Sequence, residues 1–217
     1  MIIGAILHKI EPGKVGDFLN KIVSAPKTDI LIGPDYSLMY NPERINTSDE
    51  SSYLLKELSK LSSSRNGLLI PGTSVHEVEN NQVACEAPVF ENGKLIRTIR
   101  KKGDHGESAL ASLVGKTHAR GKSGQPGIAY AGKMFSVGIC GDYGRSPLVV
   151  GDVDLVLAYD KNAGFHIHPT TLSQPRKIIV CDGFAPKVSG IDYYPRKEQK
   201  QIPLKFNVQE GVCLFKI

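Results

Sequence analysis

The chain has 217 residues, 41% of them hydrophobic, and can therefore bury a substantial core in one large domain or two small ones. Its 27 basic residues stand against 22 acidic ones, and because no long basic block occurs, the net charge of +5 allows an acidic partner without requiring one. The apolar N-terminal stretch is too short for a signal sequence and no apolar run reaches membrane-spanning length, so we expect a cytoplasmic protein with one domain over residues 1–217.

The beginning of the chain predicts a β-α-β unit. Ile2 to Leu7 is typical of a buried strand, and apolar residues then recur at helical spacing over residues 15–23. Asp29 to Gly33 is the next strand, and a helical crossover of this kind joins parallel strands. This strand ends in Pro34-Asp35-Tyr36, so the carboxylate of Asp35 comes at the carboxyl end of a strand, where open α/β sheets usually carry their sites.

A second helix is predicted after this unit. Thr47 to Glu50 has the form of a capping box, which satisfies free backbone N–H groups at the start of a helix. The leucines that follow, Leu54, Leu55, Leu58 and Leu61, form the apolar stripe of the helix. Gly67 to Pro71 then reads as a third short buried strand.

A β-hairpin is predicted over Val83 to Arg100, because Asn-Gly at positions 92 and 93 is a strong hairpin signal. These antiparallel strands would be an insertion in a parallel sheet. Side chains alternate along the second strand, which puts Lys101 on the same face as Ile99 and Lys102 on the opposite face. Of these two adjacent lysines, the pattern therefore favours Lys101 as the one that points inward.

The rest of the chain is mainly strands and loops. Residues 103–132 are predicted to be a loop-rich rim around one short helix, Glu107 to Val114. Later strands are expected at Val153 to Tyr159, Lys177 to Asp182 and Gly211 to Ile217, with a surface excursion at Asp192 to Lys205. Strands that alternate with helices, together with a hairpin, predict a mixed, mostly two-layer α/β domain.

One cysteine stands apart from the other three. Apolar residues alternate from Lys133 to Ile139, and the pattern stops at Cys140, so its thiol is held at the end of a strand but can be reached. Gly141 adds a backbone N–H beside the sulfur, a donor that can stabilise an oxyanion. A buried core cysteine is the alternative interpretation. The other cysteines are flanked by apolar residues and read as core side chains, and no C-x-x-C pair suggests a zinc or redox site.

Asp35, Lys101 and Cys140 are thus all expected at the ends of strands. A carboxylate can take the proton of a thiol, a lysine ammonium can stabilise both thiolate and oxyanion, and the thiolate can attack a carbonyl or nitrile carbon. Together the three groups would make an acyl-transfer site.

These residues occur in motifs that resemble the nitrilase, or carbon–nitrogen hydrolase, superfamily. The strand ending in Pro34-Asp35 resembles the family's strand ending in Pro-Glu, and the hairpin strand closing at Lys101 resembles the strand that carries its catalytic lysine. The segment Ile139-Cys140-Gly141-Asp142, followed by Arg145 and Pro147, resembles the family's nucleophile motif, with one extra residue before the arginine. The resemblance runs from Ile2 to about Asp182 and leaves residues 183–217 poorly matched.

The resemblance implies an αββα two-sheet sandwich, an α/β fold with mixed sheets, and hydrolysis of a small amide, nitrile or carbamoyl substrate through a thioester on Cys140. Asp35 would be the base, and Lys101 with the Gly141 N–H would hold the oxyanion. Glu107 could correspond to a second family glutamate, while Tyr36 and Tyr143 are expected to shape the pocket. The family implies no metal, no organic cofactor and a homodimer or other homo-oligomer.

The chain departs from the family pattern at its base. Asp35 replaces a glutamate, which draws the carboxylate back by about 1.5 Å, and a general base must come within about 2.6–3.2 Å of its proton. Either the backbone moves closer, a water bridges the gap, or the base is impaired. A catalytically weak or inactive member that binds a ligand or a protein is therefore the alternative function.

Two further alternatives have less support. A nucleic-acid-binding module would use the basic segment from Lys116 to Lys122, but this segment contains no aromatic residue for base stacking. His166 and His168 would share one face of an extended segment and could bind a metal, but no third ligand lies at a suitable spacing.

Overall fold

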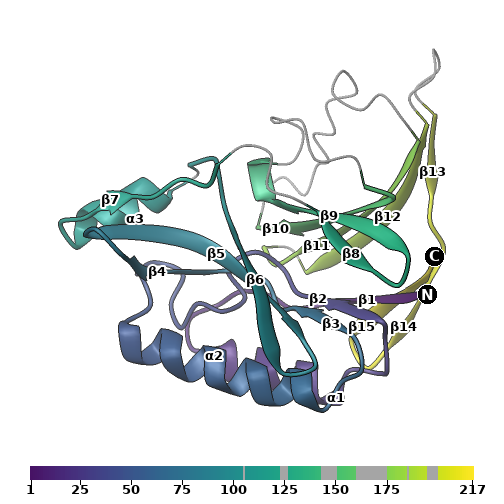
Figure 1. Ribbon diagram of the computed structural model, residues 1–217, viewed down its shortest axis with the longest axis horizontal. Helices are drawn as coiled ribbons and strands as arrows, with labels where there is room; N and C mark the ends of the chain where they lie inside the picture. Colours follow the sequence, from purple (N-terminus) through teal and green to yellow (C-terminus); the bar gives the residue numbers. More distant parts are fainter. Residues whose placement is uncertain (105, 123–126, 143–150, 160–174, 185, 195–199) are drawn as a thin grey trace.

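The computed structural model describes residues 1–104, 106–122, 127–142, 151–159, 175–184, 186–194 and 200–217. The helices within these ranges are α1 (Val15–Ser24), α2 (Ser48–Ser63), α3 (Glu107–Leu113) and the 3₁₀ turn η1 (Cys140–Asp142). None of the described helices combines the length and the hydropathy that a membrane crossing requires. The described strands form two sheets that lie against each other (Figure 1).

The first sheet has a parallel centre and antiparallel flanks. Strands β1, β2 and β3 pair in parallel, whereas β15 pairs antiparallel with β1, and β5 pairs antiparallel with β3, β4 and β6. Its strands are β1 (Ile2–Ile6), β2 (Ile30–Ile32), β3 (Leu68–Ile70), β4 (Ser74–Val78), β5 (Gln82–Glu91), β6 (Lys94–Arg100), β7 (Thr117–His118), β14 (Phe206–Gln209) and β15 (Val212–Lys216). The predicted β-α-β unit is confirmed, since α1 joins the parallel strands β1 and β2.

The second sheet follows the order β13-β12-β11-β10-β9-β8. Its strands are β8 (Ile128–Tyr130), β9 (Lys133–Ile139), β10 (Val153–Ala158), β11 (Arg176–Asp182), β12 (Lys187–Tyr194) and β13 (Lys200–Pro203). The central strands β9, β10 and β11 are parallel, and antiparallel strands flank them. Both sheets are therefore mixed, as predicted.

Alternation along β2 explains the layers. Ile30 and Ile32 point into a core between the two sheets, where they join Phe135 and Leu155 of the second sheet. Leu31 points the other way, into a second core beneath helices α1 and α2. The strand is buried on both faces, as expected for a central strand of a parallel sheet. Figure 1 shows α1 and α2 together on the outer face of the first sheet.

Several local predictions are confirmed. The hairpin of β5 and β6 turns at Asn92 and Gly93, whose φ angles of 49° and 81° are those of the tight turn that the Asn-Gly signal predicts. The capping box at Thr47 forms at the start of α2, and α3 begins at Glu107. Leu54 and Leu58 of α2 are buried, but Leu55 is 41% exposed, so the predicted apolar stripe was one residue too wide.

The predicted surface excursion at Asp192 to Lys205 is wrong in part. Residues up to Tyr194 continue β12, and Lys200–Pro203 forms β13, which pairs with β12. The sequence of this segment is rich in lysine and tyrosine and does not show the apolar pattern of a buried strand. An edge strand such as β13 does not require that pattern. Strands β4, β7, β8, β12 and β14 were also not predicted, and most of them are too short for a pattern of alternation to stand out.

The α2 capping box supplies a testable stability effect. The Thr47 hydroxyl accepts the Glu50 N–H at 3.2 Å, and the Glu50 carboxylate accepts the Thr47 N–H at 2.8 Å. Replacing Thr47 with alanine is expected to lower the free energy of unfolding by about 1 kcal/mol. Urea denaturation measures the change. Thr47→Ser keeps the acceptor and should lose much less, and equal losses for both variants would contradict this role of the hydroxyl.

Candidate active site

Asp35 lies just beyond the carboxyl end of β2, where the two sheets meet. Its backbone N–H donates to the carbonyl of Ala158, the last residue of β10, over 3.2 Å. The chain turns sharply after it, because Tyr36 has a φ of 61° in the left-handed region. The side chain of Asp35 is completely buried. The strand that the sequence predicted therefore delivers a carboxylate to the junction between the sheets.

Lys101 follows β6 and is buried beside Asp35. Its ammonium nitrogen lies 3.1 Å from Oδ2 of Asp35 and 2.7 Å from Oε1 of Glu107, and its side chain is 1% exposed. The same nitrogen lies 5.2 Å from the centre of the Tyr36 ring. Lys102, by contrast, is only half-buried. The inward orientation predicted for Lys101 is confirmed.

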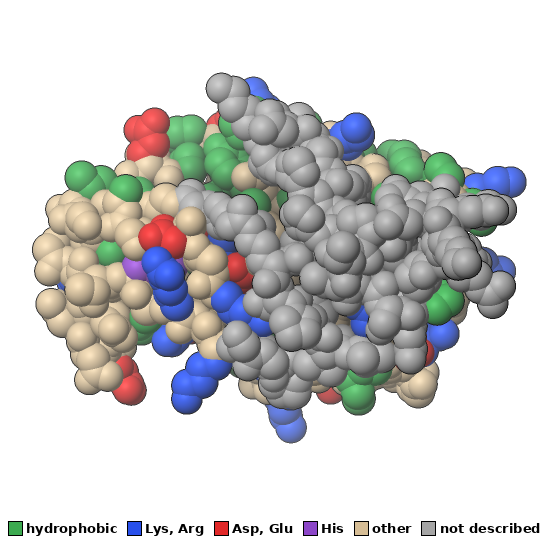
Figure 2. All heavy atoms as spheres, turned by 90° about the horizontal axis from the view of Figure 1, so that it is seen from above, with side chains coloured by type: hydrophobic (Ala, Val, Ile, Leu, Met, Phe, Trp, Pro, Cys, Tyr) green, Lys and Arg blue, Asp and Glu red, His purple; other side chains and the backbone are tan. Residues whose placement is uncertain are grey.

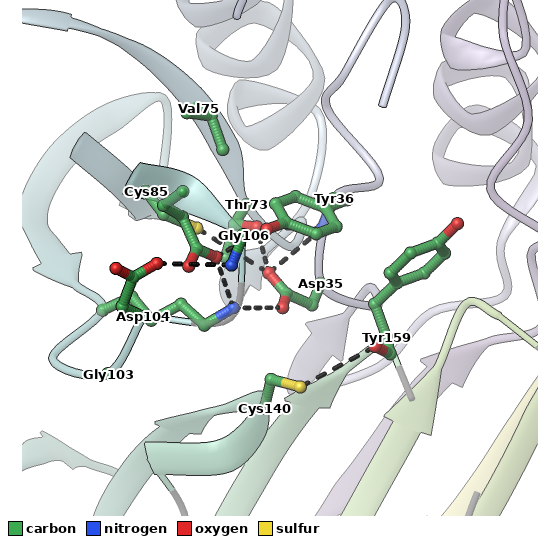
Figure 3. A network of polar contacts seen from close by, with 12 residues as sticks. Asp35, Tyr36, Thr73, Val75, Cys85, Gly103, Asp104, Gly106, Cys140 and Tyr159 are labelled. Atoms are coloured by element: carbon green, nitrogen blue, oxygen red, sulfur yellow. Dashed lines mark hydrogen bonds and ion pairs between the residues drawn. The ribbon is translucent and has the colours of Figure 1, made fainter. Parts of the chain in front are cut away.

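Glu107 is the first residue of α3 and is also fully buried. Its Oε1 accepts a hydrogen bond from the Tyr36 hydroxyl over 2.5 Å, besides the ion pair with Lys101. Tyr36 thus binds to the carboxylate with its hydroxyl while its ring faces the lysine. Three of the residues singled out from the sequence, Asp35, Lys101 and Glu107, form one connected network (Figure 3).

Cys140 directly follows β9 and is the first residue of η1, and its thiol is half-buried. Its φ of 47° places a non-glycine residue in the left-handed region, a strained conformation that often occurs at functional sites. The sulfur lies 3.8 Å from the carbonyl oxygen of Tyr159. Cys140 is therefore held beside the carboxyl end of β10, the same strand end that binds the backbone of Asp35.

Two sets of contacts place Cys140 near the buried pair of Asp35 and Lys101. On one side, the ring of Tyr159 packs edge-on against Tyr36, with centroids 5.3 Å apart. On the other side, the carboxylate of Asp142 accepts the backbone N–H groups of Lys102 and Gly103, each over 2.5 Å. In Figure 3 the Cys140 side chain lies below the Asp35 carboxylate, on the side away from Cys85.

Of the other predicted site residues, Gly141 lies among the described residues and Tyr143 does not. Gly141 directly follows Cys140 within η1, so its backbone N–H belongs to the turn that carries the thiol. Tyr143 lies outside the described residues, as do Arg145 and Pro147 of the nucleophile motif and the pair His166 and His168.

The network contains two carboxyl groups, those of Asp35 and Glu107, and one ammonium group, that of Lys101. Burial raises the pKa of Asp35, although the charge of Lys101 and the hydroxyl of Thr73 act in the opposite direction. Burial also opposes the charge on Lys101, but the surrounding acidic groups, Asp35 foremost, raise the pKa of Lys101 above its ordinary value. Lys101 therefore stays protonated. Two buried carboxyl groups share this one ammonium, an arrangement that makes Asp35 able to take up a proton.

Three contact residues were missed by the sequence analysis. Thr73 donates to the carboxylate of Asp35, Cys85 lies 3.9 Å from the same carboxylate, and Tyr159 contacts Cys140 and Tyr36. Thr73 follows a glycine in a short loop, and Cys85 lies within a strand pattern that predicts a core residue. Neither carries a local signal of a site, whereas Tyr159 lies at the end of a predicted strand, a position where α/β sheets often carry site residues.

Of three comparisons with known proteins, the one with solved structures found matches to this chain. A scan against protein-family models found no match, and a search of curated proteins found none either. The search of solved structures found a mutant of the amidase from Nesterenkonia sp. AN1 in which acrylamide has undergone Michael addition at the active-site cysteine. It has a TM-score of 0.73 and 14% sequence identity, over 100% of this chain and 93% of that chain.

Two further structures of the same amidase are similar. A mutant with the acetamide moiety of fluoroacetamide bound covalently at the active-site cysteine has a TM-score of 0.72 and 15% identity, over 100% of this chain and 90% of that one. A cysteine-to-alanine mutant, described as a member of the nitrilase superfamily, has a TM-score of 0.70 and 14% identity over the same shares of the two chains. The likeness extends over the whole chain, including the residues 183–217 whose sequence matches poorly.

Proposed function

We propose that this chain, whose fold is that of the nitrilase superfamily, is a cysteine-dependent hydrolase of non-peptide carbon–nitrogen bonds. The observation that carries the proposal is the buried lysine, Lys101, bound to two carboxylates beside a strained cysteine at a strand end. Burying a charged network is costly, and strain of this kind persists only where the surrounding structure enforces it. A role in catalysis accounts for both features.

In the first half of the reaction Asp35 takes the thiol proton of Cys140, and the thiolate attacks the carbon of the substrate amide. The new C–S bond places a negative charge on the substrate oxygen, which Lys101 and the Gly141 N–H stabilise. When the intermediate collapses, the C–N bond breaks and the amine leaves with the proton that Asp35 had taken. A thioester on Cys140 remains.

In the second half a water molecule attacks the thioester carbon while Asp35 accepts a proton from the water. The C–S bond breaks, the carboxylic acid leaves, and the Cys140 thiolate recovers its proton from Asp35. One amide and one water thus become one acid and one amine. Lys101 stays protonated throughout, because the acidic groups around it raise its pKa.

The proposed substrates are small amides, nitriles and carbamoyl compounds. Mutants of the similar amidase carry adducts from acrylamide and fluoroacetamide at the active-site cysteine, and we choose these two reagents as probes for this chain. Fluoroacetamide should transfer one acetamide group to the sulfur with loss of fluoride. We expect the adduct on Cys140 to form faster than on glutathione at the same pH, as measured by intact mass. Ammonia release from a panel of small amides and nitriles then tests turnover.

One observation favours the alternative of a catalytically weak or inactive binding protein. Asp35 has a shorter side chain than the glutamate of the family motif, so the base is set further back from its proton. An inactive protein would alkylate at the rate of an ordinary thiol and release no ammonia from any member of the panel. Rapid alkylation together with ammonia release would exclude this alternative.

A nucleic-acid-binding role has less support. On the face drawn in Figure 2, the described Lys and Arg side chains lie apart from one another with acidic side chains among them, and they do not gather into one basic patch. Lys116 is paired with Glu77, and Arg120 with Asp104, within the basic segment that the sequence singled out. Binding by this segment would rest on charge alone and would decline steeply with salt.

The pKa of Asp35 predicts a pH dependence. A base must be ionised to accept a proton, so the rate falls once the pH drops below the pKa of the carboxyl group. Burial raises this pKa, and we therefore expect the acid limb of the kcat/KM profile to lie above the ordinary aspartate range of about 3.9. The profile for Cys140 alkylation should show the same limb, and Asp35→Asn should remove it. A limb at or below the ordinary range would contradict the assignment.

A further inference from the structure

The two oxygens of the Asp35 carboxylate have different surroundings. Oδ1 accepts hydrogen bonds from the Thr73 hydroxyl and, over 3.1 Å, from the Tyr36 backbone N–H, and the sulfur of Cys85 lies 3.9 Å away. Oδ2 lies 3.1 Å from the ammonium of Lys101. Several neutral donors therefore hold one oxygen, while the other faces the lysine.

The direction of the hydrogen bond from Thr73 follows from its other contact. The Tyr36 N–H, 2.8 Å from the Thr73 oxygen, can only donate, so the hydroxyl oxygen accepts there. The hydroxyl proton is then free to be donated to Oδ1 of Asp35. Thr73 is completely buried, so water does not replace either bond without a rearrangement.

The loop that carries Thr73 is packed tightly against the turn after β2. Gly72 has a φ of 102°, and a side chain at this position would come within 2.0 Å of the Pro34 carbonyl oxygen. The Leu38 N–H donates to the Thr73 carbonyl over 3.1 Å, a second link between the two segments. The position of the hydroxyl relative to Asp35 is thus set by backbone contacts as well as by its own hydrogen bonds.

We propose that Thr73 is a positioning residue that makes Oδ2 of Asp35 the proton-accepting oxygen. This inference rests on the proposed hydrolase function. With Oδ1 anchored, the carboxylate cannot rotate to offer either oxygen, and Oδ2 is presented beside Lys101. A short aspartate reaches fewer positions than a glutamate, so a fixed orientation is the means by which this site can use it as the base.

The test compares Thr73→Val, which keeps the shape and removes the donor, with Thr73→Ser, which keeps the donor. Thr73→Val should lower kcat for amide hydrolysis by about tenfold to a hundredfold, a part of what general-base catalysis contributes, with little change in KM. It should also move the acid limb of Cys140 alkylation to higher pH, because a lost hydrogen bond to a carboxylate raises its pKa. Thr73→Ser should restore both. Thr28→Val, which changes a threonine that accepts from Arg65 outside the site, serves as the control for folding and activity.

The outcomes separate this inference from the function on which it rests. If the wild-type protein hydrolyses amides and Thr73→Val keeps the wild-type kcat and acid limb, the positioning role is wrong and the hydrolase proposal stands. If the wild-type protein shows neither hydrolysis nor rapid alkylation, the hydrolase proposal fails. In that case a ¹³C NMR titration of the aspartate carboxyls tests the hydrogen bond from Thr73 to Oδ1 of Asp35. An Asp35 pKa that rises in Thr73→Val but not in Thr73→Ser supports the anchoring of Oδ1. An unchanged pKa overturns it.

Discussion

Replacing Cys140 with alanine is expected to reduce amide hydrolysis to the uncatalysed background, a loss of at least about a thousandfold, because the proposed route has no other nucleophile. Ammonia release in a coupled assay measures this loss. The folded state should persist, since the thiol is half-buried at a strand end and the change removes one atom from a position beside a turn. Circular dichroism and a melting curve check that the variant is folded.

The same variant tests the identity of the reactive thiol. Cys85, Cys181 and Cys213 are buried, and burial raises the pKa of the first two well above the ordinary value and that of Cys213 to about 11. These thiols are therefore protonated at neutral pH and poor nucleophiles. Peptide mapping after treatment with fluoroacetamide should find the adduct on Cys140 alone, and Cys140→Ala should remain unmodified.

Cys213→Ala is the matched control, because it removes a buried thiol from the core between the sheets and leaves the site untouched. It should keep the wild-type rate of ammonia release. Hydrolysis that survives in Cys140→Ala, or an adduct that forms first on another cysteine, would overturn the assignment of the nucleophile.

Replacing Lys101 with methionine is expected to have the largest effect on stability. The substitution keeps a long apolar side chain but leaves the carboxylates of Asp35 and Glu107 buried without their common cation. Removing one partner of a buried ion pair costs about 3–5 kcal/mol. Chemical denaturation measures the loss in the free energy of unfolding, and hydrolysis should be lost as well because the oxyanion has no ammonium beside it.

The loss in Lys101→Met should depend on pH with a defined sign. Without the ammonium, the pKa of Asp35 rises further in the folded protein, so the folded state binds a proton more readily than the unfolded state. Stability of the variant should therefore improve as the pH falls toward the ordinary aspartate and glutamate range and worsen as it rises. The wild-type protein, which keeps the cation, should show a weaker trend.

Two further variants check the cause of this loss. Lys101→Met combined with Glu107→Gln removes one of the two unpaired charges and should recover part of the lost stability. Lys102→Met changes a half-buried lysine next to the site and is expected to stay within about 0.5 kcal/mol of the wild type. If Lys101→Met and Lys102→Met lost the same free energy of unfolding, the loss would not come from the ion pairs of Lys101 with Asp35 and Glu107.

Local patterns in the sequence were enough to place the principal candidate site residues on their elements. The two-residue period of a strand put Lys101 on the inward face, and the hairpin before it followed from the Asn-Gly pair at positions 92 and 93. The break in the apolar pattern placed Cys140 at a strand end, and the turn after a buried strand did the same for Asp35. Each of these inferences needed only a few neighbouring residues, because backbone geometry couples side-chain direction to position along the chain.

Contacts between distant segments could not be inferred in this way. The hydroxyl of Thr73 meets Asp35 across 38 positions in the chain, and the thiol of Cys85 approaches the same carboxylate across 50. The exposure of Leu55 and the existence of β13 were likewise settled by what packs beside them. The face of a sheet toward which a side chain points depends only on its position along its own strand. The residues that it contacts depend on how whole sheets and loops pack together. The sequence alone therefore determined which groups stand at the strand ends, and only the tertiary structure decided which oxygen of Asp35 is anchored and which faces the lysine.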